Sequence, residues 1–126
     1  MFKNIFLVGL GGALGSIARY LCIVGISRWD MPVSFPWGTL MVNVLGCLII
    51  GFLGSLAGAK QLFIESGRVF LFTGILGGFT TFSAFGLETF YLLRSSQWLL
   101  AFGNVFLQLT LGIGAVILGY WLAKFL

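Results

Sequence analysis

A short segment of this sequence, GGFTTFSAFGLET at 77–89, carries residue types that are unusual inside an apolar helix. Its adjacent glycines, Gly77 and Gly78, are followed closely by three hydroxyl side chains, and this combination offers a place for a helix to break. A break at membrane depth leaves backbone carbonyls that the protein must bury, or that meet water or an ion. Carbonyl oxygens are ligands for hard cations. The segment therefore predicts a break that can hold such a cation.

Two phenylalanines follow the expected break. Phe82 and Phe85 are three residues apart, so they share one face of a helix. An aromatic ring is negative on its face and positive at its edge, and ring edges turned into a narrow path attract an anion without a full charge. Phenylalanines at this spacing most often pack in a core. The pair alone therefore leaves two interpretations open, anion contact and simple packing.

Other polar side chains lie within the apolar part of the chain at one depth. Counted from the face opposite the termini, this layer comprises Thr39 with Asn43, Asn104 with Gln108, and Arg19 with Glu88. At a rise of about 1.5 Å per residue, Asn43 and Asn104 lie roughly 10 Å deep. A buried charge costs about 2.5–3.5 kcal/mol on insertion scales, so we expect Arg19 and Glu88 to form an ion pair. A hydrogen bond between helices, at about 0.6 kcal/mol, is enough to explain the presence of any single amide in this layer. The presence of two polar pairs and two charged residues at one depth favours a hydrated vestibule instead.

The composition places these residues in an all-α integral membrane protein. The 126 residues are 60% hydrophobic and 8% charged, with a mean hydropathy of +1.11. A spanning helix needs roughly 20 apolar residues, and the chain divides into four such spans at about 4–26, 36–58, 67–93 and 98–124. The linkers are too short for a soluble domain, so we expect a single four-helix transmembrane domain over 1–126. The third span, about 40 Å long as one helix against a core of about 30 Å, has length to spare for a break near its middle.

The chain lacks the residues of common catalytic and metal sites. It has no histidine and only three acidic residues, and its cysteines, Cys22 and Cys47, match no metal-ligand spacing. We therefore do not expect an enzyme. The formal charge of +4 comes from basic residues scattered singly near helix ends, where they anchor to lipid headgroups. Nucleic-acid binding is for this reason not expected.

The glycine-rich segment GLGGALG at 9–15 resembles a dinucleotide-binding loop only in part. A leucine occupies the place of the third glycine, and no strand precedes the segment. Close helix packing explains it better, because Gly11 and Gly15 have the spacing that lets membrane helices approach one another. Gly54 and Gly58 repeat this spacing in the second span.

The basic residues are almost balanced between the two faces of the membrane. Four spans place both termini on one side, which holds Lys3, Lys60, Arg68 and Lys124, whereas the other side holds Arg19, Arg28 and Arg94. Orientation follows the Lys and Arg asymmetry of short loops, so this chain has little reason to insert in one direction only. Dual topology and an antiparallel homodimer with a two-fold axis in the membrane plane are the prediction. A fixed orientation decided by one or two charges is the alternative.

Taken together, the motifs resemble the Fluc or CrcB fluoride channels of bacteria. The resemblance covers nearly the whole chain through GGALGSIARY, PWGTLMVNVLG, TGILGGFTTFSAFGLET and GIGAVILG, one motif in each span. It implies a passive, fluoride-selective channel that exports fluoride from the cytoplasm and protects against fluoride toxicity. It also implies an antiparallel dual-topology homodimer with two pores, located in the bacterial inner membrane.

The resemblance assigns roles to particular residues. It implies that Phe82 and Phe85 line the pore and that Asn43 is a polar pore contact. To these the polar residue types add Thr39, Ser83, Asn104 and Gln108 along the expected fluoride path. A structural Na⁺ at the centre of the dimer is expected on the backbone carbonyls at the break, where Gly77 and Thr80 are the matching positions. The chain departs from the family pattern in its polar lining, because Ala84 and Gly86 replace hydroxyl residues and an Asn and a Gln stand where the fourth span commonly carries Tyr and Ser.

Two other function classes fit the composition. Small proton-coupled multidrug transporters are also dual-topology dimers of four-helix chains, but they carry a coupling glutamate in the first helix, where this chain has Arg19 and no acid. Glu88 could replace it only from a position well away from the centre of the third span. A structural subunit of a larger complex is the third possibility, and it explains neither the break nor the polar layer.

Overall fold

The computed structural model describes residues 1–29, 34–59 and 64–125, and within these ranges the chain is helical with short connections and no strand. The elements are α1 (Phe2–Ile26), α2 (Trp37–Ala59), α3 (Glu65–Arg68), η1 (Val69–Leu76), α4 (Gly77–Phe79), α5 (Phe82–Arg94), α6 (Trp98–Leu122) and η2 (Ala123–Phe125). They form four helical segments long and apolar enough to cross a membrane: Phe2–Ile26, Trp37–Gly58, Glu65–Arg94 and Trp98–Phe125. The prediction of four spans is confirmed. Lys60, one of the basic residues on which the topology prediction depends, lies outside the described residues.

The third span is interrupted, as its sequence predicts, but the interruption is not at the glycines. Gly77 and Gly78 are helical, and the chain becomes extended only at Thr80 (φ −83°, ψ 157°) and Thr81 (φ −150°, ψ 112°). β-Branched residues favour this conformation. The Thr81 hydroxyl then accepts a hydrogen bond from the backbone N–H of Ala84 at 3.2 Å and so caps α5.

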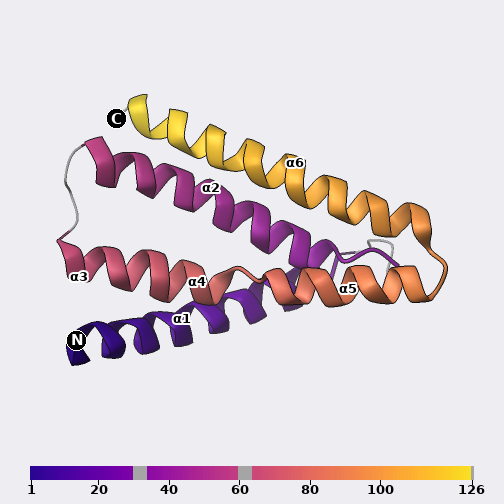
Figure 1. Ribbon diagram of the computed structural model, residues 1–126, viewed down its shortest axis with the longest axis horizontal. Helices are drawn as coiled ribbons and strands as arrows, with labels where there is room; N and C mark the ends of the chain where they lie inside the picture. The colour runs from indigo at the N-terminus through magenta and orange to yellow at the C-terminus, as the bar shows by residue number, and fades with distance from the viewer. Residues whose placement is uncertain (30–33, 60–63, 126) are drawn as a thin grey trace.

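The helices pack as two pairs that diverge toward the end where both termini lie (Figure 1). On one side α1 lies against η1 and α4; on the other, α2 runs along α6. After the break, α5 packs on α6. The break thus lets one transmembrane span contact α1 with its first half and α6 with its second.

Close approach to the third span explains two glycines of α1, Gly11 and Gly15. A Cβ on Gly11 would lie 2.8 Å from the carbonyl oxygen of Phe70, and a Cβ on Gly15 would collide with the carbonyl oxygen of Ile75. The packing predicted for these two glycines is confirmed. The same spacing at Gly54 and Gly58 marks no close helix contact among the described residues, where nothing lies within 4 Å of a Cβ at either position.

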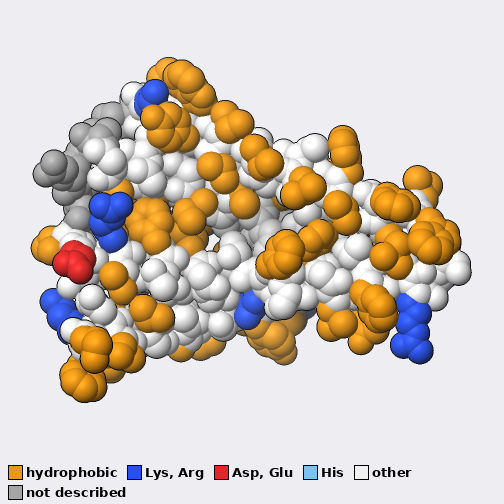
Figure 2. All heavy atoms as spheres, viewed as in Figure 1, with side chains coloured by type: hydrophobic (Ala, Val, Ile, Leu, Met, Phe, Trp, Pro, Cys, Tyr) orange, Lys and Arg blue, Asp and Glu red, His pale blue; other side chains and the backbone are white. Residues whose placement is uncertain are grey.

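The surface is mostly apolar, and polar groups are among the buried residues. Figure 2 shows hydrophobic side chains spread over one face, with most of its basic side chains toward the two ends. Buried polar residues are Thr39, Ser55, Thr81 and Asn104. Near the C-terminus the Lys124 ammonium lies 4.4 Å from the ring centroid of Trp121, an arrangement suited to the membrane interface. This distribution is that of a chain whose outer solvent is lipid.

Candidate functional site

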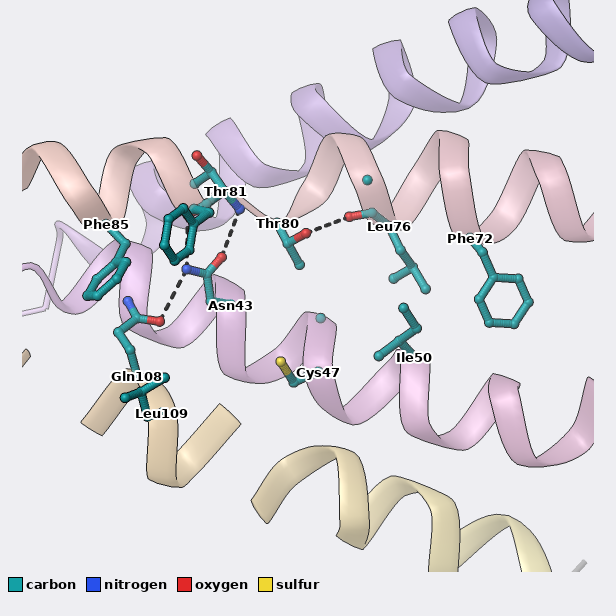
Figure 3. A pocket seen from close by; sticks show the side chains of 13 residues that line it. Asn43, Cys47, Ile50, Phe72, Leu76, Thr80, Thr81, Phe85, Gln108 and Leu109 are labelled. Carbon is teal, nitrogen blue, oxygen red and sulfur yellow. Dashed lines mark hydrogen bonds between the residues drawn. The ribbon is translucent and has the colours of Figure 1, made fainter. Parts of the chain in front are cut away.

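The break in the third span is closed by one side chain of α2. Asn43 Oδ1 accepts from the backbone N–H of Thr81 at 2.8 Å, and Asn43 Nδ2 donates to the carbonyl oxygen of the same residue at 3.1 Å (Figure 3). The Thr81 N–H has lost its helical partner, Gly77 O, and leaving such a group unpaired at membrane depth costs several kcal/mol. The Asn43 carboxamide therefore replaces a turn of helix and fixes where the span bends.

This clamp determines the orientation of the next amide, on α6. Because the N–H of Thr81 can only donate, Asn43 must face it with oxygen and present its nitrogen on the other side. That nitrogen donates to Gln108 Oε1 at 3.2 Å. Gln108 must therefore accept with its oxygen and turn its NH₂ group away. Gln108 Nε2 is buried and has no hydrogen-bond partner among the described residues.

A cavity of about 350 Å³ opens beside this amide pair. Its lining comprises Asn43, Gly46, Cys47, Ile50, Phe72, Leu76, Gly77, Thr80, Thr81, Phe82, Phe85, Gln108 and Leu109. Figure 3 shows the Gln108 nitrogen and the Phe85 ring at the same end of the cavity. The Phe82 and Phe85 rings meet edge to face with centroids 5.4 Å apart, and Phe82 is 82% exposed in this chain. An unpaired N–H donor and ring edges are both groups that favour an anion.

The carbonyl groups at the break face a different set of partners. The Thr80 hydroxyl and backbone N–H both donate to Leu76 O, at 2.9 and 3.0 Å. Thr80 O accepts from Arg19 Nη1 at 3.5 Å. Among the described residues no N–H or O–H group donates to Gly77 O, since the Thr81 N–H that would reach it in a continuous helix is bound to Asn43 instead. The break therefore presents carbonyl oxygens that retain capacity for another ligand.

Arg19 and Glu88, expected as an ion pair, have different partners in the structure. Arg19 binds the carbonyl oxygen at the break, whereas Glu88 Oε1 accepts from the Thr39 hydroxyl at 2.6 Å. Within the described part of the chain the two charges do not meet. The cause is the break, which directs α5 toward α6 while α1 stays against η1 and α4. Glu88 lines two smaller cavities, of about 330 and 270 Å³.

The seven residues expected along the fluoride path separate into two groups. Those that line the 350 Å³ cavity are Asn43, Phe82, Phe85 and Gln108. The other three have partners elsewhere. Thr39 donates to Glu88, and Ser83 Oγ lies 3.3 Å from Thr81 Oγ1. Asn104 Nδ2 donates to Thr89 Oγ1 at 2.9 Å. Gly77 and Thr80, expected to hold a cation, lie at the wall of the same cavity.

Of two hydroxyl residues in these networks, sequence reasoning named Thr81 only as part of the expected break and missed Thr89. Thr81 holds the break and caps α5, and its position one residue before a helix was a usable signal. Thr89 accepts from Asn104 and donates to Phe85 O at 2.8 Å. A lone threonine within an apolar span carries no signal of that kind, because its hydroxyl usually bonds within its own helix.

The structure thus has a mostly apolar cavity at a break in a membrane helix, with a buried amide pair at one end, an arrangement suited to an ion-conducting membrane protein. The family model described as "CrcB-like protein, Camphor Resistance (CrcB)" matches residues 6–120. The chain belongs to this family, as its motifs indicated.

Relatives in several bacteria share much of the sequence. The chain is 42% identical over 120 residues to the fluoride-specific ion channel FluC of Nitrobacter winogradskyi. The matched residues cover 95% of this chain and 94% of that protein. It is 50% identical over 118 residues to FluC of Helicobacter pylori strain J99 (91% and 88%) and 46% identical over 124 residues to FluC of Parabacteroides distasonis (96% and 93%).

Proposed function

We propose that this chain is a fluoride-selective passive channel, which exports fluoride across the bacterial inner membrane and so protects the cell from fluoride toxicity. Its relatives with 42–50% identity are named fluoride-specific ion channels. The observation that carries the proposal is the Gln108 N–H group, which is buried, has no hydrogen-bond partner among the described residues, and is held by the Asn43 clamp at the end of the cavity where the Phe85 ring lies.

The chemistry of this cavity suits a small anion. Fluoride is strongly hydrated, so a path must offer hydrogen-bond donors and positive ring edges in place of water. Gln108 Nε2 supplies the donor, and Phe82 and Phe85 supply the edges. None of these groups carries a full positive charge, so the anion is not held too tightly to leave. Because the membrane potential is negative inside, a passive path is sufficient for export.

The functional unit in this proposal is an antiparallel homodimer of dual topology with two pores. The near balance of Lys and Arg supports dual topology. The exposure of Phe82, which is 82%, supports a dimer, because one wall of the cavity is left open in the single chain. A second, inverted copy would close this wall.

A structural Na⁺ at the break is part of the same proposal. Na⁺ is a hard cation that takes oxygen ligands. Among the described residues Gly77 O has no donor, and Thr80 O accepts a single long hydrogen bond, from Arg19. One chain offers too few such oxygens for a complete shell, whereas a two-fold axis at the break would double them. When bound, the ion would join the two chains, and it has no step in conduction.

Fluoride release from liposomes tests the function. Purified protein is placed in vesicles loaded with potassium fluoride, and an electrode follows fluoride after a potassium ionophore is added. We expect rapid release that depends on the ionophore and does not change with a pH gradient. Release that requires a proton gradient, or that is equally fast without the ionophore, would favour coupled exchange and contradict the channel.

Dual topology has its own test. In a chain whose Cys22 and Cys47 are replaced by alanine, Ser27→Cys introduces a single exposed thiol near one end of the spans. Membrane-impermeant maleimide should label it from both sides of the membrane, in intact cells and in inverted vesicles. Labelling from one side alone would support a fixed orientation and contradict the antiparallel dimer.

A further inference from the structure

Asn104 has a place that the anion path does not explain. It is fully buried, with 0% of its surface exposed, and it is absent from the wall of the 350 Å³ cavity. Its Nδ2 donates to Thr89 Oγ1 at 2.9 Å, and Thr89 Oγ1 lies 2.8 Å from Phe85 O. A chain of two hydrogen bonds thus runs from α6 to the backbone of the residue whose ring lines the cavity.

The direction of this chain is set by the Thr89 hydroxyl. A hydroxyl has a single hydrogen, and a carbonyl oxygen can only accept, so Thr89 gives its hydrogen to Phe85 O. Thr89 Oγ1 must then accept from Asn104, which must face it with nitrogen. Asn104 Oδ1 is left buried without a hydrogen-bond partner among the described residues. A leucine would fit this site without that cost, which indicates that the amide contributes something other than stability.

The bond from Thr89 to Phe85 O acts on helix geometry. A threonine hydroxyl that bonds the carbonyl four residues earlier shares that carbonyl with the helical N–H and bends the turn slightly. Asn104 pins the hydroxyl in this arrangement from the neighbouring helix. The turn that carries the Phe85 ring is therefore held by α6 and not by α5 alone.

Gln108 lies one turn after Asn104 on the same helix. Residues four apart share a helix face, so α6 carries both the unpaired N–H donor and the residue that holds the Phe85 turn. We propose that Asn104 is a positioning residue, which acts through Thr89 to set the Phe85 ring edge relative to the Gln108 N–H group. This inference rests on the proposed fluoride function.

Two variants and their combination test the link. Thr89→Val removes the hydroxyl with little change of shape, and Asn104→Leu removes the amide. We expect each to lower the maximal rate of fluoride release about fivefold to tenfold, the equivalent of one hydrogen bond, with dimer yield on size exclusion unchanged. The double variant should be no slower than the slower single variant. Thr89→Ser, which keeps the hydroxyl, should restore release to near the wild-type rate.

Thr110→Val is the matched control. Thr110 makes the same bond to a carbonyl four residues earlier, Phe106 O at 2.7 Å, but it is exposed on α6 and contacts no cavity residue through that bond. Its loss should leave release unchanged. Wild-type release by folded Thr89→Val, or rates that multiply in the double variant, would overturn the proposal.

A spectroscopic measurement separates this inference from the channel itself. 4-Fluorophenylalanine at position 85 gives a ¹⁹F signal that reports the surroundings of the ring. We expect Asn104→Leu and Thr89→Val to shift or broaden this signal in the same way, and Thr110→Val to leave it in place. An unchanged signal in both variants would overturn the positioning role even if the protein conducts fluoride. If the wild-type protein releases no fluoride but both variants shift the ¹⁹F signal, only the channel function is overturned.

Discussion

The two halves of the third span are held in opposite ways. The first half, η1 and α4, packs against α1 at glycines, which have no side chain. Gly15 and Gly78 therefore each contact the backbone of the facing helix. The second half, α5, is held by side chains that reach across: Asn43 to Thr81, Thr39 to Glu88, and Asn104 to Thr89. The first contact is steric and tolerates no added atom. The second is polar and depends on particular donors and acceptors.

The largest effect should come from the steric half. Gly15→Ala places a methyl group against Ile75 O, where backbone and not a flexible side chain must move. Overpacking of this kind costs about 1–3 kcal/mol or more, so we expect little folded dimer on size exclusion and a clear loss of thermal stability. Gly12→Ala is the control, because nothing lies within 4 Å of its Cβ. Equal yields of the two variants would show that α1 and the third span are not packed as described.

Removal of the clamp should be the next largest effect. Asn43→Leu leaves the Thr81 N–H without a partner and removes the second bond to the Thr81 carbonyl, and an unsatisfied buried group costs about 1–3 kcal/mol. We expect a lower thermal midpoint and a loss of fluoride release. Gln97→Leu, which removes an exposed amide, should change neither quantity. A stable Asn43→Leu dimer that releases fluoride normally would contradict the role of Asn43 at the break.

Substitution of a ring should separate conduction from folding. Phe82→Ile keeps an apolar side chain but has no positive ring edge, and volume-conserving swaps cost less than about 1.5 kcal/mol of stability. We expect an intact dimer whose fluoride release is slower by about tenfold, or ~1.4 kcal/mol in the barrier. Phe90→Ile on the same helix, also exposed, should release fluoride at the wild-type rate. Wild-type release by a well-folded Phe82→Ile dimer would make Phe82 a packing residue.

The smallest effect should follow loss of the unpaired donor. Gln108→Met keeps the length of the side chain and removes its N–H groups, while Asn43 can still hold Thr81. The fluoride concentration for half-maximal release should rise a few-fold, since one hydrogen bond is worth roughly 1 kcal/mol. The thermal midpoint should change little. An unchanged concentration dependence would remove Gln108 from the anion path.

The sequence predicted a break near the middle of the third span from two glycines and three hydroxyl residues, but it did not show which of these residues leave the helix. Gly77 and Gly78 suggested the break because glycine is flexible, but both remain helical and Gly78 provides close contact with Gly12 instead. The extended residues are Thr80 and Thr81. A sequence shows that a residue permits a conformation. Only the neighbouring helix shows whether that freedom is used for a bend or for close packing.

Composition and motifs by themselves determined the four spans, the interrupted third span and the family, because burial in lipid requires long apolar helices and the motifs are specific. Tertiary structure decided which polar residues meet. Arg19, Glu88 and Asn104 were expected at one depth, and each has a partner that depth does not predict. Depth follows from the rise of a helix and is local. The face that a helix turns to its neighbour depends on packing, and here on a break that sends α5 from α1 to α6.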